Sequence, residues 1–479
     1  MTTATFPRSG TSAPPLVGHP ADSSFMQELA FKLYLFFMVS WFLHLPARLP
    51  ALGALRVDLL VVVATAGLIF VSAAGSNQRL DTRINRLLLA LFAYSIVTLP
   101  FVEWPGSVIR HGIPELTKAV VFYYFTALLV TSEQKLSRVL FVFVACQAFR
   151  VLEPLYLHLT TGYWGSAAHM GGADFLYRLG GAPSDIVNPN GLAAVVVTVL
   201  TFAHYLWTGT SLGRVAYLGL LPLLLYALTL TGSRSGLVAL AATFIVIWFQ
   251  SRRKGLLALV GVAVVMLAIP RLSADLQDRY LSIVDQNTKN ATTAQARVDG
   301  IKADFGVAMR RPLFGHGLGT SREANGNFGR RARVSHNLFT EVAQELGFVG
   351  LTLFTVLLLS IGRSVRAALR TLRSSSTANP LLVRLCCALQ VWFVVNILSS
   401  MFTYGLSSYD WYFMAGLANV MTLLLAATPA ATDAREPEAS PAAAGPPHVQ
   451  PITPPHGVRA RRAQPVRPAS RGVSARSMR

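Results

Sequence analysis

The sequence is short of charged residues. Asp, Glu, Lys and Arg make up 13% of its 479 residues, whereas 53% are hydrophobic. A soluble globular protein carries about 25% charged residues, so the shortage excludes a chain whose main solvent is water. Apolar runs of roughly 18 to 23 residues recur, and each could cross the ~30 Å hydrocarbon core of a membrane as a helix. Because lipid offers backbone groups no other partners, the runs predict an all-α polytopic membrane protein.

Cysteine is also scarce. Cys146, Cys386 and Cys387 all fall within apolar runs and lack metal-ligand spacing, which excludes a disulfide framework and a zinc site. No small-residue cleavage pattern ends the first apolar run near Leu45, so this run is predicted to be a retained span rather than a signal peptide. The sequence shows no 20–50-residue repeat and no inverted pair of broken helices of the kind that builds many transporters.

The apolar windows predict about twelve transmembrane helices. Residues 1–25 form an N-terminal segment before this bundle, which spans 26–427, and 428–479 form a basic, Pro- and Ala-rich tail predicted to be disordered. Arginine and lysine concentrate in the loops on the side of the two termini, so this side is predicted to be cytoplasmic. The predicted spans are 26–46, 56–75, 87–104, 113–131, 136–157, 189–209, 214–231, 234–250, 255–270, 337–362, 384–405 and 410–427.

The long loop at 271–335 is predicted to face the periplasm although it is rich in arginine. Loops longer than about 60 residues cross a membrane largely regardless of charge. Arginine offers planar forks of donors that match phosphate oxygens, so converging arginines suit a lipid-linked diphosphate. A solvated basic loop is the alternative for any single one of them. The basic residues are Arg271, Arg279, Lys289, Arg297, Lys302, Arg310, Arg311, Arg322, Arg330, Arg331 and Arg333.

One arginine lies at the start of an apolar helix. Arg234 lies in Gly-Ser-Arg-Ser-Gly, where a charge is costly and where the flanking Gly232 and Gly236 allow a ligand to approach the backbone closely. Amide groups at a helix start also favour an anion. The alternative is a structural arginine whose charged end reaches towards water.

Two further segments of this region carry polar groups. Arg297 begins an amphipathic stretch that ends at Pro312, and a turn containing Gly315, Gly317 and Gly319 follows. The turn lacks the strand-then-helix context of a nucleotide motif, so a dinucleotide or P-loop site is rejected. Ser335-His336-Asn337 then precedes a span, and a neutral histidine there could act as a general base. Glu341 and Glu345 share a helix face and could orient His336, shape a hydrated cavity or pack against an arginine.

Charged pairs also occur inside two predicted spans. Arg150 and Glu153 are spaced i, i+3, as are Glu115 and Lys118, so each is predicted to pair with the other and to be structural. The alternative is that these residues border the path of the lipid.

His336-Asn337, nine residues, Gly347, two residues and Gly350 resemble the H-[NSQ]-x9-G-x2-G signature of O-antigen ligases, and every position matches. The resemblance extends to Gly-Ser-Arg234-Ser-Gly, to the Arg297 segment with its glycine turn and to Asn188-Pro-Asn190. It covers residues 185–360.

This resemblance implies a GT-C-like membrane glycosyltransferase of the O-antigen ligase and polymerase superfamily. Such enzymes transfer a glycan from an undecaprenyl-diphosphate donor, on the periplasmic side of the bacterial inner membrane, and the resemblance implies no metal or other cofactor. His336 would be the catalytic base, and Arg234 and Arg297 would contact the diphosphate. Arg331 is added as a third contact on charge alone. The acceptor would be a glycan or lipid A-core, and no nucleic-acid partner is expected.

Three alternatives stay open. The sequence does not separate a ligase from a polymerase, because both need the same leaving group. A flippase for lipid-linked glycans would also have about twelve spans, but it should hold its essential charges near the bilayer midplane. A non-catalytic scaffold would leave the His336 motif and Arg234 unexplained.

Overall fold

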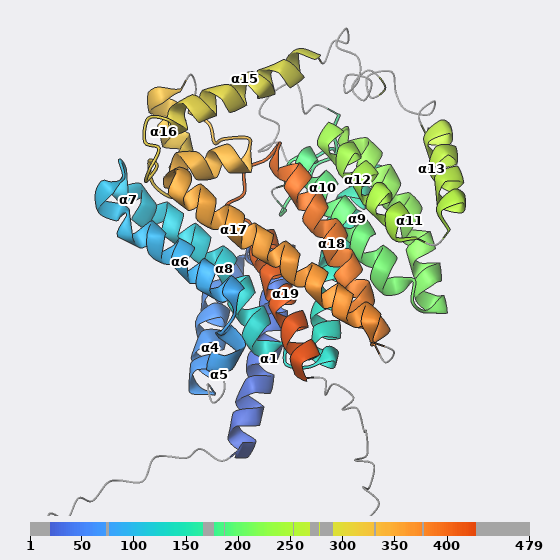
Figure 1. The fold of residues 1–479 in the computed structure, drawn as a ribbon. Coiled ribbons are helices and arrows are strands. Elements are labelled where there is room, and N and C mark those ends of the chain that lie inside the picture. Colours follow the sequence, from blue (N-terminus) through green and yellow to red (C-terminus); the bar gives the residue numbers. More distant parts are fainter. Residues whose placement is uncertain are drawn as a thin grey trace, which may run out of the picture. The chain divides into compact units, whose positions relative to one another are not determined.

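The computed structural model describes residues 20–72, 76–165, 177–185, 187–251, 253–268, 277, 291–329, 332–375 and 378–427. Their regular elements are helical (Figure 1). The predicted segment 1–25 lies outside this part of the chain except for its last residues, and the predicted tail 428–479 lies outside it entirely. The main helices are α1 (Pro20–Leu43), α4 (Val57–Val71), α6 (Arg83–Val97), α8 (Ile113–Leu129), α9 (Glu133–Thr161), α10 (Pro189–Trp207), α11 (Ser211–Thr231), α12 (Arg234–Gln250), α13 (Lys254–Ala268), α15 (Ala291–Ala308), α16 (Ser321–Phe328), α17 (Leu338–Ser374), α18 (Pro380–Ser400) and α19 (Tyr409–Ala427).

Each predicted span overlaps one of these main helices. Within the described residues, six helices are long and apolar enough to cross a membrane: α1, α9, α10, α11, α17 and α18. Helices α4 and α12 are apolar but shorter. The chain is therefore an all-α membrane protein, while twelve membrane crossings and a GT-C-like arrangement remain predictions.

Short polar side chains determine where several of these helices begin. The side chains of Asn188, Thr210, Ser233, Asn337 and Asn379 each accept a hydrogen bond from an amide in the first turn of α10, α11, α12, α17 and α18, respectively. These amides have no partner within their own helix, and a side-chain acceptor satisfies them. The caps thus separate long apolar runs into distinct helices, including α11 and α12.

The interior of the bundle is aromatic. Phe122, Phe143, Phe202, Trp392 and Phe413 are fully or almost fully buried and come from α8, α9, α10, α18 and α19. Phe143 lies 4.9 Å from Phe413 and 5.3 Å from Phe202, measured between ring centroids. Such tilted and edge-to-face pairs add to the stabilisation that burial provides.

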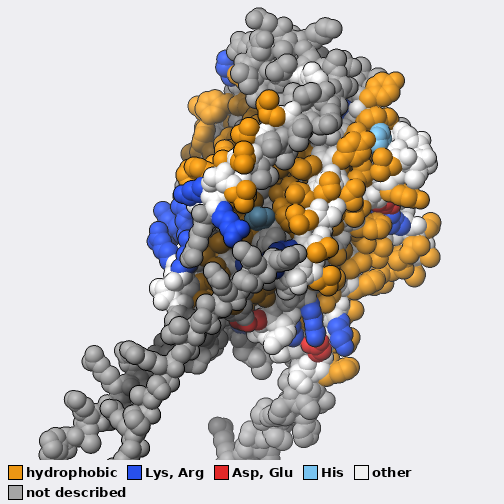
Figure 2. Space-filling model, turned by 90° about the vertical axis from the view of Figure 1, so that its right-hand side faces the viewer, with side chains coloured by type: hydrophobic (Ala, Val, Ile, Leu, Met, Phe, Trp, Pro, Cys, Tyr) orange, Lys and Arg blue, Asp and Glu red, His pale blue; other side chains and the backbone are white. Residues whose placement is uncertain are grey.

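Large apolar side chains also cover the outside of the bundle. Phe70 on α4 and Leu212 on α11 are 84% and 80% exposed, and Leu259 and Met266 continue the pattern on α13. Figure 2 shows broad hydrophobic areas on this face, with basic side chains gathered mainly towards its margins. Exposed apolar surface of this extent marks contact with another apolar phase, which for this helical bundle is lipid.

The long loop predicted at 271–335 contains helices α15 and α16. Helix α15 packs on α17, and both it and α16 lie beyond the ends of the bundle helices (Figure 1). Of the remaining loop residues, 271–276, 278–290 and 330–331 lie outside the described part of the chain.

The structure corrects one of the two predicted charged pairs. Lys118 donates to Glu115 at 2.7 Å, as predicted. Arg150 and Glu153, in contrast, do not pair with each other. The guanidinium of Arg150 donates to both carboxylate oxygens of Asp185, at 2.6 and 3.0 Å, and Glu153 accepts from Arg48 at 2.6 Å. Spacing along a helix identified a neighbour, but partners from other segments compete for the same charges.

Candidate active site

The first part of the candidate site is the turn between α11 and α12. Gly232 ends α11 with φ of +54°, a left-handed conformation that glycine adopts without steric cost. Ser233 caps α12 by accepting a hydrogen bond from the amide of Gly236 at 3.1 Å. Arg234 is the first residue of α12 and is only 9% exposed. The turn therefore holds a buried arginine at the positive end of a helix dipole, where an anion is stabilised.

A second arginine, which sequence reasoning missed, supports this turn. Arg178 is 5% exposed and donates to the carbonyl of Thr231 at 2.7 Å and to Oδ1 of Asn190 at 2.9 Å. The same Oδ1 accepts from the hydroxyl of Ser233 at 2.9 Å. Asn190, at the start of α10, thus links Arg178 to the α12 cap. No sequence motif surrounds Arg178, and only its tertiary partners reveal it.

The second part of the site is the start of α17. The side chain of Asn337 caps this helix by accepting from the amides of Phe339 and Thr340, at 2.9 and 3.1 Å. The buried hydroxyl of Ser335 donates to the carboxylate of Asp304 on α15, at 2.8 Å. His336, between these two fixed residues, has an exposed side chain. The backbone is therefore held firmly while the imidazole is presented to its surroundings.

Asp304 connects α15 to this segment. Its side chain is 7% exposed, and burial raises the pKa of the carboxyl above its usual range. The hydrogen bonds from Ser335 and Asn325 and the nearby charges of Arg333 and a protonated His336 lower this pKa in part. Each of these partners stabilises the ionised carboxylate, whereas removal from water favours the neutral acid.

Glu341 and Glu345 do not orient His336 in the structure. Glu341 accepts from the amides of Gly405 and Leu406, at 2.7 and 3.3 Å. Glu345 accepts from the amides of Gly319 and Ser321, at 2.8 and 3.2 Å. The two carboxylates share a helix face, as expected, but each fixes a different loop against α17.

The signature glycines permit close backbone packing. Gly347 interrupts α17 with φ of +67° and ψ of −173°, and a Cβ there would collide with the carbonyl of Leu313. The glycine turn docks at this kink: the amide of Gly317 donates to the carbonyl of Glu345 at 2.9 Å, and the amide of Phe348 donates to the carbonyl of Pro312 at 2.7 Å. In the described structure this turn pairs with α17, so its glycines serve packing.

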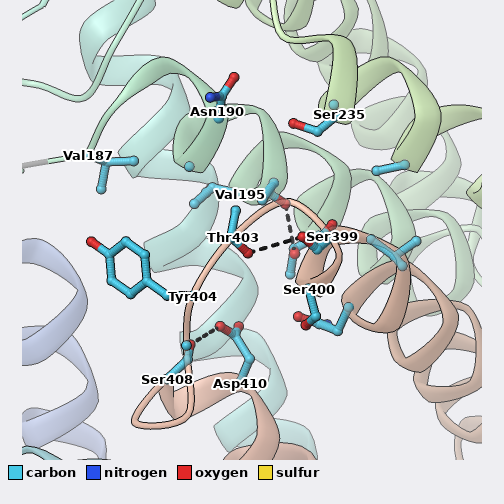
Figure 3. Close-up of a pocket in the computed structure, with 18 of the residues that line it drawn as sticks. Val187, Asn190, Val195, Ser235, Ser399, Ser400, Thr403, Tyr404, Ser408 and Asp410 are labelled. Carbon is cyan, nitrogen blue, oxygen red and sulfur yellow. Dashed lines mark hydrogen bonds between the residues drawn. The ribbon is translucent and has the colours of Figure 1, made fainter. Parts of the chain in front are cut away.

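A cavity of about 260 Å³ lies between α10, α12, α18 and the segment leading into α19 (Figure 3). Ser235 and Gly236 of the α12 turn line it, and so does Asn190 of the Arg178 network. Tyr404 also lines it, and the ring centroid of Tyr404 lies 6.5 Å from that of His336. The cavity is therefore flanked by both parts of the candidate site.

The structure describes two of the four predicted site residues in full. Arg234 is at the start of α12, next to the cavity-lining Ser235, and His336 directly precedes the start of α17, beside the cavity-lining Tyr404. Arg297 is in α15, but its side chain lies outside the described part of the structure, and so does the whole of Arg331. Within the described residues, no three His, Cys, Asp or Glu side chains are grouped so that they could hold a metal ion.

One comparison with known proteins identifies a relationship. Residues 219–355 match the family model described as O-antigen ligase. This range contains the α12 turn, α15, the glycine turn and the start of α17, including His336 and both signature glycines. No curated protein matches the chain.

Proposed function

We propose that the chain, which matches the O-antigen ligase family model over residues 219–355, transfers or polymerises a glycan carried on undecaprenyl diphosphate. The observation that supports this proposal best is the cavity beside the α12 turn. Its lining includes Ser235, the neighbour of the buried Arg234, and Tyr404, whose ring centroid lies 6.5 Å from that of the exposed His336. Glycosyl transfer needs two functions at such a site: stabilisation of the anionic leaving group and removal of a proton by a general base.

In the proposed reaction, neutral His336 removes a proton from a hydroxyl group of the acceptor. The hydroxyl oxygen attacks the anomeric carbon of the lipid-linked glycan and forms the new glycosidic bond. The bond from this carbon to the diphosphate breaks, and its electron pair leaves with undecaprenyl diphosphate. Attack from the side opposite the leaving group inverts the anomeric configuration.

Arginine stabilises the departing diphosphate in this proposal. Charge gathers on the leaving group as the bond breaks, so donors already in position stabilise the transition state more than the ground state. Arg234 supplies such a donor from the first turn of α12. Arg297 and Arg331 are proposed as further diphosphate contacts. Arg297 derives this role from the family resemblance, and Arg331 derives it from charge alone.

The proposed setting is the inner membrane of a bacterium, with the site facing the periplasm. The donor is then a membrane lipid, and the acceptor is a second glycan or a lipid A-core. The identity of the acceptor distinguishes the two activities: a polymerase transfers the glycan to a second glycan, and a ligase transfers it to a lipid A-core.

The alternative is a flippase that moves the lipid-linked glycan without breaking it. Its essential charges should lie near the middle of the spans. Among the described residues, the buried Arg150–Asp185 pair is an observation that favours this alternative.

Reconstituted protein separates the two activities. Wild type, His336→Ala and the control His111→Ala, which changes another exposed histidine, are incubated with a native undecaprenyl-diphosphate glycan pool, candidate acceptors and a chelator. Release of undecaprenyl diphosphate and the size of the glycan product are measured. We expect release by wild type and His111→Ala, with a loss of about 10²–10⁴ in His336→Ala, the usual contribution of a general base.

Each other outcome has a definite meaning. Equal release by wild type and His336→Ala removes His336 as the base. If no acceptor supports release while the glycan lipid changes leaflet, the flippase replaces the transferase.

A further inference from the structure

Hydroxyl and amide side chains make up ten of the 21 residues that line the cavity, and apolar side chains provide much of the rest of its wall. Asn190 and Ser235 lie at one end, and Ser408 and Asp410 lie at the other (Figure 3). Ser399, Ser400 and Thr403 lie between them. Side chains of this kind both donate and accept hydrogen bonds, as the hydroxyl groups of a sugar do.

The charges around the cavity disfavour an anion at the end where Ser408 and Asp410 lie. Arg150 borders the cavity, but its guanidinium is already bound by both oxygens of Asp185. The carboxylate of Asp410 also borders the cavity and accepts from the hydroxyl of Ser408 at 2.6 Å. A diphosphate beside Asp410 would meet a like charge, whereas a hydroxyl group could donate to it in a charge-assisted hydrogen bond.

The position of the cavity indicates which part of a substrate it would hold. Ser235 follows Arg234 directly, so one end of the cavity adjoins the proposed diphosphate contact. Tyr404 connects it with the neighbourhood of His336. The sugar attached to the diphosphate must lie between the leaving group and the base. Its reacting carbon is bonded to the leaving group, and the acceptor hydroxyl approaches that carbon from the other side.

The volume restricts the ligand further. At about 260 Å³ the cavity is smaller than the roughly 300–1,000 Å³ that is usual for pockets that hold drug-sized ligands. It has room for a single sugar ring rather than for an oligosaccharide.

We propose that this cavity binds the first sugar of the lipid-linked donor, and that Asp410 accepts a hydrogen bond from a hydroxyl group of that sugar. The inference rests on the proposed transferase function. It assigns substrate recognition to residues of α18 and the start of α19 that no signature motif contains, together with Asn190 of α10.

Direct binding tests the assignment without requiring turnover. Undecaprenyl diphosphate carrying a single sugar and bare undecaprenyl diphosphate are titrated into wild type, Asp410→Asn and the control Asp81→Asn, which changes an exposed aspartate. We expect Asp410→Asn to weaken binding of the sugar-bearing lipid by about 10- to 100-fold, the usual effect of a hydrogen bond to a charged group. Asp410→Asn should bind the bare lipid as tightly as wild type does. Asp81→Asn should bind both the sugar-bearing and the bare lipid as tightly as wild type does.

A cavity-filling variant covers the case in which Asp410→Asn does not fold. Ala194→Leu adds volume to the cavity wall without changing charge, and Ala64→Leu adds the same volume on the exposed face of α4. Ala194→Leu should raise the KM for the donor and leave the KM for the acceptor unchanged, and Ala64→Leu should alter neither.

The outcomes separate this inference from the function on which it rests. The sugar subsite alone is overturned if wild type turns over, Asp410→Asn binds the sugar-bearing lipid as wild type does, and Ala194→Leu keeps the wild-type KM for the donor. A raised acceptor KM with an unchanged donor KM also overturns it, because the cavity then holds the acceptor. Wild type that releases no undecaprenyl diphosphate with any acceptor overturns the proposed function itself.

Discussion

The two helix starts that flank the cavity are built differently. At the start of α12, Arg234 is buried, and the adjoining turn is fixed by side-chain hydrogen bonds from Arg178 and Ser233 to Asn190. At the start of α17, the neighbours of His336 are fixed by caps and by Asp304, whereas the imidazole itself is exposed.

The difference corresponds to the two chemical roles proposed for these residues. A group that stabilises developing charge is most effective when its position is fixed before the reaction, so that no reorganisation is needed. A base must reach the proton of a substrate that arrives from outside, and an exposed side chain permits this. Variants at the two starts should therefore differ in how far they change activity and how far they change stability.

The largest expected effect is on activity at the α12 start. Arg234→Ala should lower the rate of undecaprenyl diphosphate release by about 10²–10³, as removal of one preorganised donor does. Arg234→Lys should restore little of the lost rate, because lysine lacks the planar fork of arginine. Arg214→Lys, at an exposed position of α11, is the control and should keep full activity. Full activity of Arg234→Ala in correctly inserted protein would remove this residue from the mechanism.

The next effect concerns the kink that places the start of α17 against the glycine turn. In Gly347→Ala, the positive φ and the collision with the Leu313 carbonyl should destabilise the fold, by about 1–3 kcal/mol for the backbone strain alone. Thermal unfolding in detergent measures this. Gly219→Ala on α11, where a Cβ would meet no neighbour, should leave the midpoint unchanged or raise it. A normal midpoint for Gly347→Ala would contradict the packing role assigned to this glycine.

A moderate effect is expected when the shared partner at the α12 start is removed. Asn190→Ala takes away the acceptor of both Arg178 and Ser233 and should cost about 1–3 kcal/mol of stability. Asn190→Asp keeps an acceptor opposite Arg178 and should retain most of the stability that Asn190→Ala loses. The comparison at the α17 start is Asn337→Ala, which removes a helix cap usually worth about 0.5–2 kcal/mol. If activity falls with Asn190→Ala far more than with Asn337→Ala, the preorganised flank is the more sensitive one.

The smallest effect is one of pH at Asp304. Burial raises the pKa of this carboxyl in the folded protein, so the fold gains stability from it below its ordinary pKa and loses that gain as pH rises through the raised value. Asp304→Asn cannot ionise and should flatten the dependence of the unfolding midpoint on pH from about 4 upwards. Asp299→Asn, at an exposed position of the same helix, should leave the dependence as in wild type. If the unfolding midpoint of Asp304→Asn depended on pH as steeply as that of wild type, the raised pKa of Asp304 would be contradicted.

Much of the helical framework follows from the sequence. Apolar runs located a helix in each predicted span, and Ser233 and Asn337 indicate where α12 and α17 begin because their short side chains satisfy free amides. The resemblance carried by His336, Gly347 and Gly350 is confirmed by the match over residues 219–355. Local pattern suffices here because capping and hydropathy act within a few residues.

Only the tertiary structure decided which polar groups meet. Arg150 pairs with Asp185 rather than with Glu153, Glu341 and Glu345 bind loop amides rather than His336, and Arg178 joins a turn more than fifty positions along the chain. The sequence by itself determined the α-helical membrane character and the resemblance to O-antigen ligases. Long-range contacts determined the cavity and its lining, because a hydrogen bond depends on distances in space that spacing along the chain does not specify.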